Sequence, residues 1–117
     1  MKLSEAIRVG SEKSSEVSHI TLVWGAPGEP VQACALGAAW LATHEPPWNE
    51  ADKCRGLVSV GPDLREAYLF LRESIAWPGP ADCGYIYVDM EGCIMELMDR
   101  AHWTRAQIAD WVESLGY

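Results

Sequence analysis

Four cysteines and three histidines are the residues of this chain best suited to metal binding or nucleophilic chemistry. They are Cys34, Cys54, Cys83, Cys93, His19, His44 and His102. A zinc site needs three or four such ligands that converge at bonding distance. The cysteines form no C-x-x-C pair and their spacing matches no zinc motif, so we predict no metal site and no cofactor. A Cys/His metalloprotein is kept as a second alternative.

A catalytic thiol is not indicated either. Cys34 lies in an alanine-rich segment, where burial would raise the pKa of its thiol and lower its reactivity. Cys83 lies between Asp82 and Gly84, and a neighbouring carboxylate disfavours the thiolate. The sequence shows no glycine loop suited to an oxyanion. We therefore predict no catalytic residue and no enzymatic activity.

Composition limits the class of protein. The chain has 117 residues, of which 49% are hydrophobic, and this predicts one globular domain over residues 1–117. A formal net charge of −8 makes binding to nucleic acid or to an anionic membrane unfavourable. Residues 1–8 lack the apolar run of a signal peptide, and no segment is apolar enough to span a membrane. We expect a cytoplasmic protein with reduced cysteines, and the composition specifies no oligomeric state.

Most of the elements that would position these residues are predicted to be helices. The expected helices are residues 3–9, residues 31–43, a helix capped by Asp63, residues 90–99, and a last helix after Thr104. In the first helix, Ser4 is the expected N-cap and Gly10 the expected end. Small side chains in the second helix predict that another backbone approaches closely at Gly37. The helix after Asp63 has an apolar stripe of Leu64, Tyr68, Leu71 and Ile75.

Strand signals are weaker than helix signals in this chain. Residues 19–24 and 85–88 are short strand candidates, because they are rich in β-branched and aromatic side chains. Residues 11–18 and 44–61 are expected to be irregular. The predicted fold class is mainly α, a compact bundle of four to five helices with at most a small two-stranded β element.

The last predicted helix has the most complete set of local signals. Thr104 and Gln107 form a T-x-x-Q capping box, and Trp103 and Ile108 are placed for a hydrophobic staple. Its predicted apolar stripe consists of Ile108, Trp111, Val112 and Leu115. Gly116 is a natural C-terminal stop. These signals specify local structure and no chemistry.

Three segments form a set whose order and spacing are distinctive. They are M-K-L-S-E-A-I-R at residues 1–8, C-A-L-G-A-A at residues 34–39 and H-W-T-R-x-Q-I-A-D-W-V at residues 102–112. Together they resemble a group of small uncharacterised proteins of bacteria and their phages. The resemblance implies no particular activity. Because the group includes phage proteins, it suggests a host-directed inhibitor or anti-defence factor.

We therefore expect a non-enzymatic protein-interaction module that binds its partner through an acidic surface bearing aromatic side chains. The expected partner-binding residues are Trp48, Met95, Glu96, Arg105, Asp110 and Glu113. Of these, Arg105, Asp110 and Glu113 are expected to face water on the last helix. Met90, Met95 and Met98 would form an apolar patch with Trp103; the alternative is that Met90 and Met98 lie in the core and Met95 alone is exposed.

A nucleic-acid-binding regulator is the first alternative. Residues 103–117 resemble one component of a degenerate helix-turn-helix, in which Arg105 would contact phosphate. However, the chain from Asp82 onward has seven acidic residues and two arginines. Such a local charge repels phosphate, so we expect nucleic-acid binding to be unfavourable.

Overall fold

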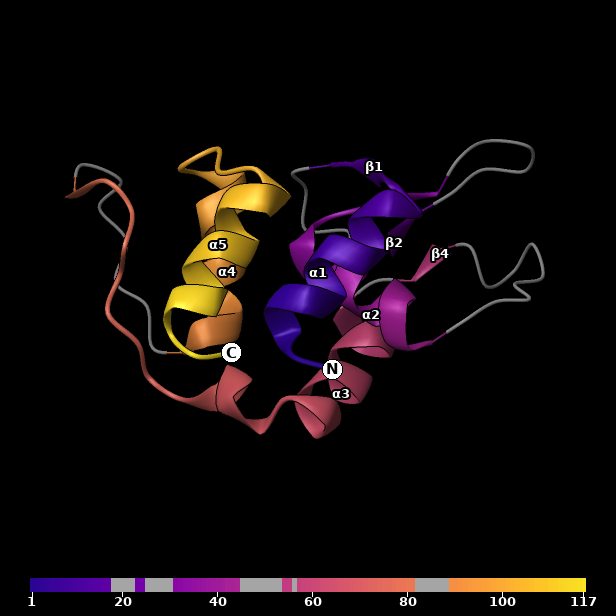
Figure 1. The fold of residues 1–117 in the computed structure, drawn as a ribbon, viewed down its shortest axis with the longest axis horizontal. Helices are drawn as coiled ribbons and strands as arrows, with labels where there is room; N and C mark the ends of the chain where they lie inside the picture. The colour runs from indigo at the N-terminus through magenta and orange to yellow at the C-terminus, as the bar shows by residue number, and fades with distance from the viewer. Residues whose placement is uncertain (18–22, 25–30, 45–53, 56, 82–88) are drawn as a thin grey trace.

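Five α-helices form most of the described structure, which confirms the predicted mainly α class. The computed structural model describes residues 1–17, 23–24, 31–44, 54–55, 57–81 and 89–117 (Figure 1). The α-helices are α1 (Leu3–Glu12), α2 (Ala35–Thr43), α3 (Leu57–Ala67), α4 (Met90–Asp99) and α5 (Arg105–Ser114), and a 3-10 helix, η2 (Leu69–Arg72), follows α3. Within the described residues, no helix has the length and apolar character needed to cross a membrane.

The packing centres on α2, because its side chains are small. Residues 35–41 of α2 are all buried, and α1 makes its most extensive contact with this helix. The two backbones approach so closely that a Cβ atom added at Gly10 would overlap the carbonyl oxygen of Ala38 and lie 2.8 Å from its Cα. A second backbone therefore approaches this helix closely, as expected, but it does so at Ala38, which faces Gly10, rather than at the predicted Gly37.

The start of α2 is capped by sulfur atoms rather than by oxygen. The amide of Ala35 donates a hydrogen bond to Sδ of Met98 at 3.1 Å, and the amide of Gly37 donates to Sγ of Cys34 at 3.5 Å. Sulfur is a weak acceptor, but it brings little polarity into the core. Because Cys34 is the N-cap, α2 begins after it and not at the predicted residue 31.

The β element is larger than the expected pair of strands, although each strand has two residues. The strands are β1 (Ser15–Glu16), β2 (Val23–Trp24), β3 (Gln32–Ala33) and β4 (Cys54–Arg55), in the order β1-β3-β2-β4. β1 pairs with β3 in parallel, and the other two pairings are antiparallel. β1 and β3 lie in segments predicted as loop and helix, since long-range backbone pairing decides their structure. The strand candidate at residues 85–88 lies outside the described residues.

The boundaries of α1 and α3 also differ from the prediction. α1 begins after Lys2 rather than Ser4 and continues through Gly10 to Glu12, because packing against α2 stabilises a glycine that would otherwise end it. α3 begins at Leu57 and contains Pro62, so Asp63 is not its N-cap. The Asp63 carboxylate instead accepts a hydrogen bond from Nε1 of Trp40 at 3.0 Å and links α3 to α2.

The predicted inward face of α4 is confirmed, whereas the helix predicted to carry Leu64, Tyr68, Leu71 and Ile75 ends at Ala67. Leu64 of α3, Tyr68 before η2 and Leu71 of η2 are still buried and Ile75 is half-buried, so the expected stripe faces the core although it does not lie on one helix. In α4, Ile94, Leu97 and Met98 are buried, as expected. The largest fully buried side chains are Leu3, Ile7, Leu36, Leu64, Leu71, Met90, Ile94, Leu97, Met98 and Ile108. These residues join α1, α2, α3, η2, α4 and α5 in one core.

α5 begins and ends as predicted. Its Thr104–Gln107 capping box is formed, and Gly116 adopts a φ of 91° after the last turn. The amide of Gly116 donates to the carbonyl of Glu113 at 2.9 Å, and that of Tyr117 donates to Val112 at 3.2 Å. These two bonds form a Schellman motif. The predicted apolar stripe is correct for Ile108 and Val112, whereas Trp111 is half-buried and Leu115 is exposed beyond the final turn.

We expect Gly10→Ala to lower the free energy of unfolding by about 3 kcal/mol, because the new methyl group overlaps the α2 backbone, which cannot rotate away. Urea unfolding measures this loss. Gly79→Ala is the matched control: its added Cβ meets the side chains of Trp77 and Leu97, which can shift, so its loss is smaller. An equal or larger loss for Gly79→Ala would contradict the α1–α2 contact.

Candidate functional site

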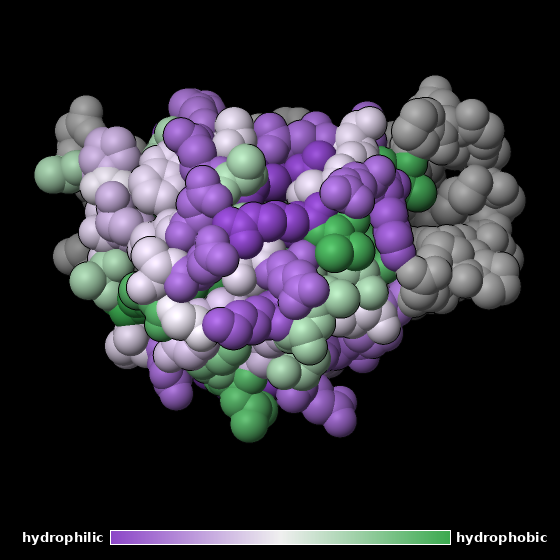
Figure 2. All heavy atoms as spheres, viewed as in Figure 1, coloured by the Kyte–Doolittle hydropathy of each residue, from purple (hydrophilic) through white to green (hydrophobic). Residues whose placement is uncertain are grey.

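An open groove of about 460 Å³ lies where α1, β1 and the first turn of α5 meet. It is lined by Arg8, Ser11, Glu16, Thr104, Arg105 and Ala106. Hydrophilic atoms cover the face between α1 and α5 on which it opens (Figure 2). We call this feature the α1–α5 groove. Its size is in the range of ligand-binding clefts, which makes it the candidate functional site.

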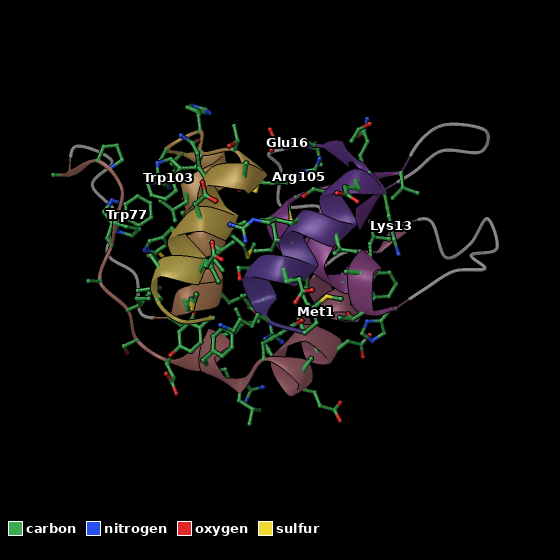
Figure 3. The ribbon with its side chains drawn as sticks, in the orientation of Figure 1. Met1, Lys13, Glu16, Trp77, Trp103 and Arg105 are labelled. Carbon is green, nitrogen blue, oxygen red and sulfur yellow. The ribbon has the colours of Figure 1, made fainter. Side chains whose placement is uncertain are left out.

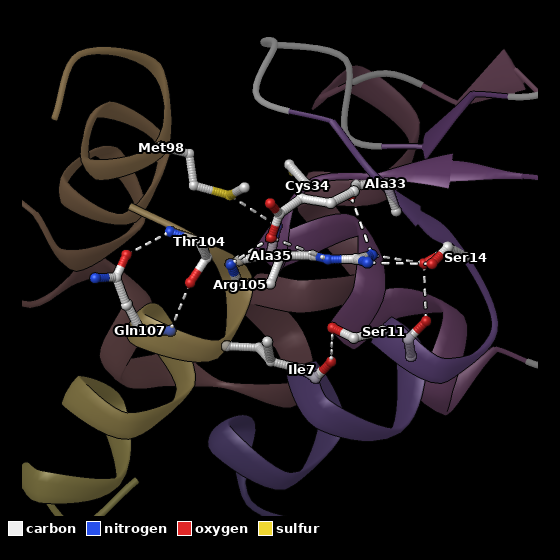
Figure 4. A network of polar contacts seen from close by, with 12 residues as sticks. Ile7, Ser11, Ser14, Ala33, Cys34, Ala35, Met98, Thr104, Arg105 and Gln107 are labelled. Carbon is white, nitrogen blue, oxygen red and sulfur yellow. Dashed lines mark hydrogen bonds and ion pairs between the residues drawn. The ribbon is translucent and has the colours of Figure 1, made fainter. Parts of the chain in front are cut away.

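The first turn of α5 forms one wall of the groove. Backbone amides of this turn donate hydrogen bonds to side chains of the protein. Oγ1 of Thr104 accepts a hydrogen bond from the amide of Gln107 at 3.2 Å, and Oε1 of Gln107 accepts from the amide of Thr104 at 2.8 Å (Figure 4). The amide of Arg105 donates to Oε1 of Glu16 at 2.6 Å. A carboxylate from β1 thus lies at the positive end of the α5 dipole.

The expectation that Arg105 faces water is wrong: its side chain is only 9% exposed. Nη1 donates to Oγ of Ser14 at 2.8 Å and to the carbonyl of Ala33 at 3.3 Å, and Nη2 donates to the carbonyl of Ser14 at 3.1 Å. Nε lies 3.6 Å from Oε1 of Glu16. Burial lowers the pKa of this guanidinium, and the Glu16 carboxylate opposes the shift. Arg105 therefore joins α5 to β1 and β3.

The sequence held a signal for this burial. Arg105 precedes Ile108, Ala109 and Val112 by three, four and seven residues, and these three side chains are buried. The predicted stripe of α5 continues back to Arg105, which the periodicity places on the inner face. Its charge led to the wrong expectation, because an arginine is buried only when partners satisfy it. Those partners come from β1 and β3, which the sequence did not reveal.

Asp110 and Glu113 are exposed, as expected, but they are not free acids. Nη2 of Arg8 lies 2.7 Å from Oδ1 of Asp110 and 2.9 Å from Oε2 of Glu113. Hydrogen bonds to Glu113 and then to Asp110 raise the pKa of Arg8. The sequence reading missed Arg8, because nothing local shows that α1 packs beside α5. The acidic character of this face is partly neutralised by α1.

The other expected partner-binding residues are not in the groove. Met95 is half-buried on α4, and Glu96, also on α4, pairs with Nε of Arg100 at 2.7 Å. Trp48 lies outside the described residues. Met90 and Met98 are 1% exposed, so the expected methionine patch with Trp103 is wrong. The alternative is confirmed for the burial of Met90 and Met98, but Met95 is half-buried rather than exposed. Figure 3 shows Glu16 and Arg105 on the side of α5 that faces α1, with Trp77 and Trp103 on its far side.

Cys34 and Cys93 are buried. Burial raises the pKa of the Cys34 thiol to about 11 and that of the Cys93 thiol to about 12. The expected low reactivity of Cys34 agrees with this environment. His44 stacks on Trp40 with ring centroids 5.0 Å apart. Among the described residues, no group of three or more Cys, His, Asp or Glu side chains is arranged to hold a metal ion.

The structure does not describe the side chains of some of the candidate metal ligands. His19 and Cys83 lie outside the described residues, and so does the side chain of Cys54. The prediction that the chain binds no metal therefore remains a prediction.

Comparisons with protein-family models, curated proteins and solved structures found no match to this chain. The resemblance to small proteins of bacteria and phages therefore stays a prediction.

We expect Arg105→Met to lower the free energy of unfolding by about 3 kcal/mol, because it removes the three hydrogen bonds that the guanidinium donates to Ser14 and Ala33 and the cation that lies beside the Glu16 carboxylate. Urea unfolding measures the loss. Arg8→Met is the matched control: it removes shorter ion pairs that are exposed to solvent, so its loss is much smaller. A larger loss for Arg8→Met would contradict the structural role of Arg105.

We expect Cys34 and Cys93 to resist alkylation by iodoacetamide at pH 8, because a thiol with a pKa of about 11 is only about 0.1% thiolate at that pH. Mass spectrometry of proteolytic peptides measures the labelling of each cysteine. The same protein in urea is the control, and both thiols should then react readily. Native labelling as fast as labelling in urea would show that these side chains are not buried.

Proposed function

We propose that this chain is a non-enzymatic protein-binding module and that it receives a polypeptide segment in the α1–α5 groove. One observation carries this proposal: the groove presents both signs of charge within one open cleft of about 460 Å³. Arg8 of α1 and Glu16 of β1 both line it. A polypeptide supplies both donors and acceptors along its backbone, so it suits such a lining better than a ligand of one charge does.

The rigidity of the groove supports this role. Arg105 joins α5 to Ser14, the residue before β1, by hydrogen bonds, and the capping box fixes the first turn of α5. A preorganised surface loses less conformational entropy on binding than a mobile one does. The contacts with a partner then contribute to the free energy of binding without a loss from ordering the groove.

The alternatives have less support. Arg105 was the residue expected to contact phosphate, and its guanidinium is directed into the protein. Carboxylates of Glu16, Asp110 and Glu113 lie in or beside the groove, and they would repel a nucleic-acid backbone. A host-directed inhibitor encoded by a phage, suggested by the resemblance, is the most specific form of the protein-binding proposal.

We expect Ala106→Arg to abolish or strongly weaken partner binding, because Ala106 is exposed in the groove and an arginine side chain would fill it. The immobilised chain first captures proteins from a bacterial lysate. Each captured protein is then purified and titrated against the wild type and the variant. The dissociation constant should rise about tenfold or more, as it does when a central contact is lost.

Ala81→Arg is the matched control, since Ala81 is also exposed but is not part of the groove lining. It should bind like the wild type, and circular dichroism should show that both variants fold. Equal affinity of the wild type and Ala106→Arg for every captured protein would refute the groove as the binding site.

A further inference from the structure

Strand β1 forms one edge of the sheet and borders the α1–α5 groove. It is the terminal strand in the order β1-β3-β2-β4, and within the described residues it pairs with β3 alone. Figure 1 shows β1 above β2 and β4, at the top of the sheet. Glu16 of this strand also lines the groove. An edge strand presents backbone N–H and C=O groups with which another chain can pair.

The hydrogen bonds of β1 show which of its backbone groups are already used. The amide of Ser15 donates to the carbonyl of Val31 at 2.9 Å, and the amide of Val17 donates to that of Ala33 at 3.3 Å. Successive residues of a strand direct these groups to opposite sides, so the amide and carbonyl of Glu16 are directed away from β3. In the part of the chain that the structure describes, neither group has a hydrogen-bond partner.

This edge fits a segment in extended conformation. In a hydrogen-bonded antiparallel pair two residues exchange both backbone bonds, so one residue of an added strand can satisfy the amide and the carbonyl of Glu16 together. An α-helix cannot do so, because its own backbone groups are bonded to each other. One such pair gives weak binding, so side-chain contacts must add to it.

The charges beside the groove indicate which side chains such a segment carries. Asp110 and Glu113 share the Nη2 atom of Arg8, and their side chains are 77% and 60% exposed. An ionised carboxylate has about four acceptor sites, so one guanidinium leaves acceptor capacity on both acids. With two negative charges and one positive charge, this group has a net charge of −1. A second cation from a partner would complete it.

The remaining charges of residues 1–17 and of α5 cancel in pairs. These pairs are Lys2 and Glu5, Glu12 and Lys13, and Glu16 and the buried Arg105. The net charge of −1 at Arg8, Asp110 and Glu113 is therefore not compensated from these elements, and the whole chain has a net charge of −8. Both charges attract a basic segment and repel an acidic one.

We propose that the polypeptide segment received by the α1–α5 groove is extended and basic, an inference that rests on the proposed function of the groove. Its backbone pairs with Glu16 at the outer edge of β1, and its lysine or arginine side chains bind Asp110 and Glu113. This is strand addition, in which backbone bonds fix the segment and side-chain contacts select it.

An NMR titration of the nitrogen-15-labelled 117-residue chain tests this proposal. The probe is a hexapeptide of alternating lysine and valine with both ends capped. It should move the amide resonance of Glu16 downfield and slow its hydrogen exchange, because that amide becomes hydrogen-bonded. A hexapeptide of alternating glutamate and valine is the control and should leave the resonance unchanged. No change at Glu16 with about 5 mM of the lysine peptide, a concentration that detects even millimolar binding, would overturn the proposal.

Glu16→Pro and Glu16→Ala form a matched pair for the backbone contact. Both remove the carboxylate that accepts from the amide of Arg105, but only proline removes the amide of residue 16. That amide is directed out of the sheet, where an edge strand tolerates proline. The dissociation constant of the lysine peptide should be about fivefold higher for the proline variant, since one hydrogen bond is lost. Equal constants in two variants that fold by circular dichroism would refute strand addition.

A second pair of variants tests the charge. Asp110→Asn combined with Glu113→Gln should raise the dissociation constant of the lysine peptide several-fold, because both carboxylates beside the groove are neutralised. Glu66→Gln combined with Glu73→Gln is the matched control, since these exposed acids do not line the groove. Equal weakening by both double variants would show that only the net charge of the chain matters and would refute the proposed contact.

Failure of this inference differs from failure of the groove as the binding site. A captured protein that loses affinity for Ala106→Arg but binds Glu16→Pro and Glu16→Ala equally well would keep the groove and refute strand addition. Binding of the lysine peptide that depends on the amide of residue 16 but not on Ala106→Arg would keep the pairing at β1 and refute the groove.

Discussion

The burial of the Arg105 guanidinium is the constraint on which the packing of α5 against β1 and β3 depends. A buried charge is unfavourable unless its environment satisfies it. Here two backbone carbonyls, one hydroxyl and one carboxylate do so, and they come from Ser14, Glu16 and Ala33. Two-residue strands have little stability of their own, so this arginine helps to hold β1 and β3 in place. The α1–α5 groove exists because that junction is fixed.

Two kinds of contact therefore organise the molecule. Between α1 and α2 the contact is apolar and very close, and it depends on the missing side chain of Gly10. Between α5 and the sheet the contact is polar, and it depends on the side chain of Arg105. The first sets the position of α1 against the core, and the second sets the position of α5 against the sheet. Exposed ion pairs from Arg8 to Asp110 and Glu113 then join α1 to α5.

The sequence predicted what local signals decide. The capping box at Thr104, the stop at Gly116 and the buried face of α4 all depend on residues within one or two turns. It did not predict the continuation of α1 through Gly10 or the strand at Gln32–Ala33, because contacts with distant segments override local propensity there. The groove was missed for the same reason: its lining comes from α1, β1 and α5, and no local pattern shows that these elements meet.

The sulfur atoms at the start of α2 have a consequence for how this sequence can change over evolutionary time. Methionine and cysteine in a core are usually interchangeable fillers, and leucine or alanine replaces them with little effect. Here Met98 and Cys34 are acceptors for the amides of Ala35 and Gly37. A leucine of equal volume at Met98 would leave a buried amide without an acceptor. Neutral drift at these two positions should therefore be narrower than their hydrophobicity alone would suggest.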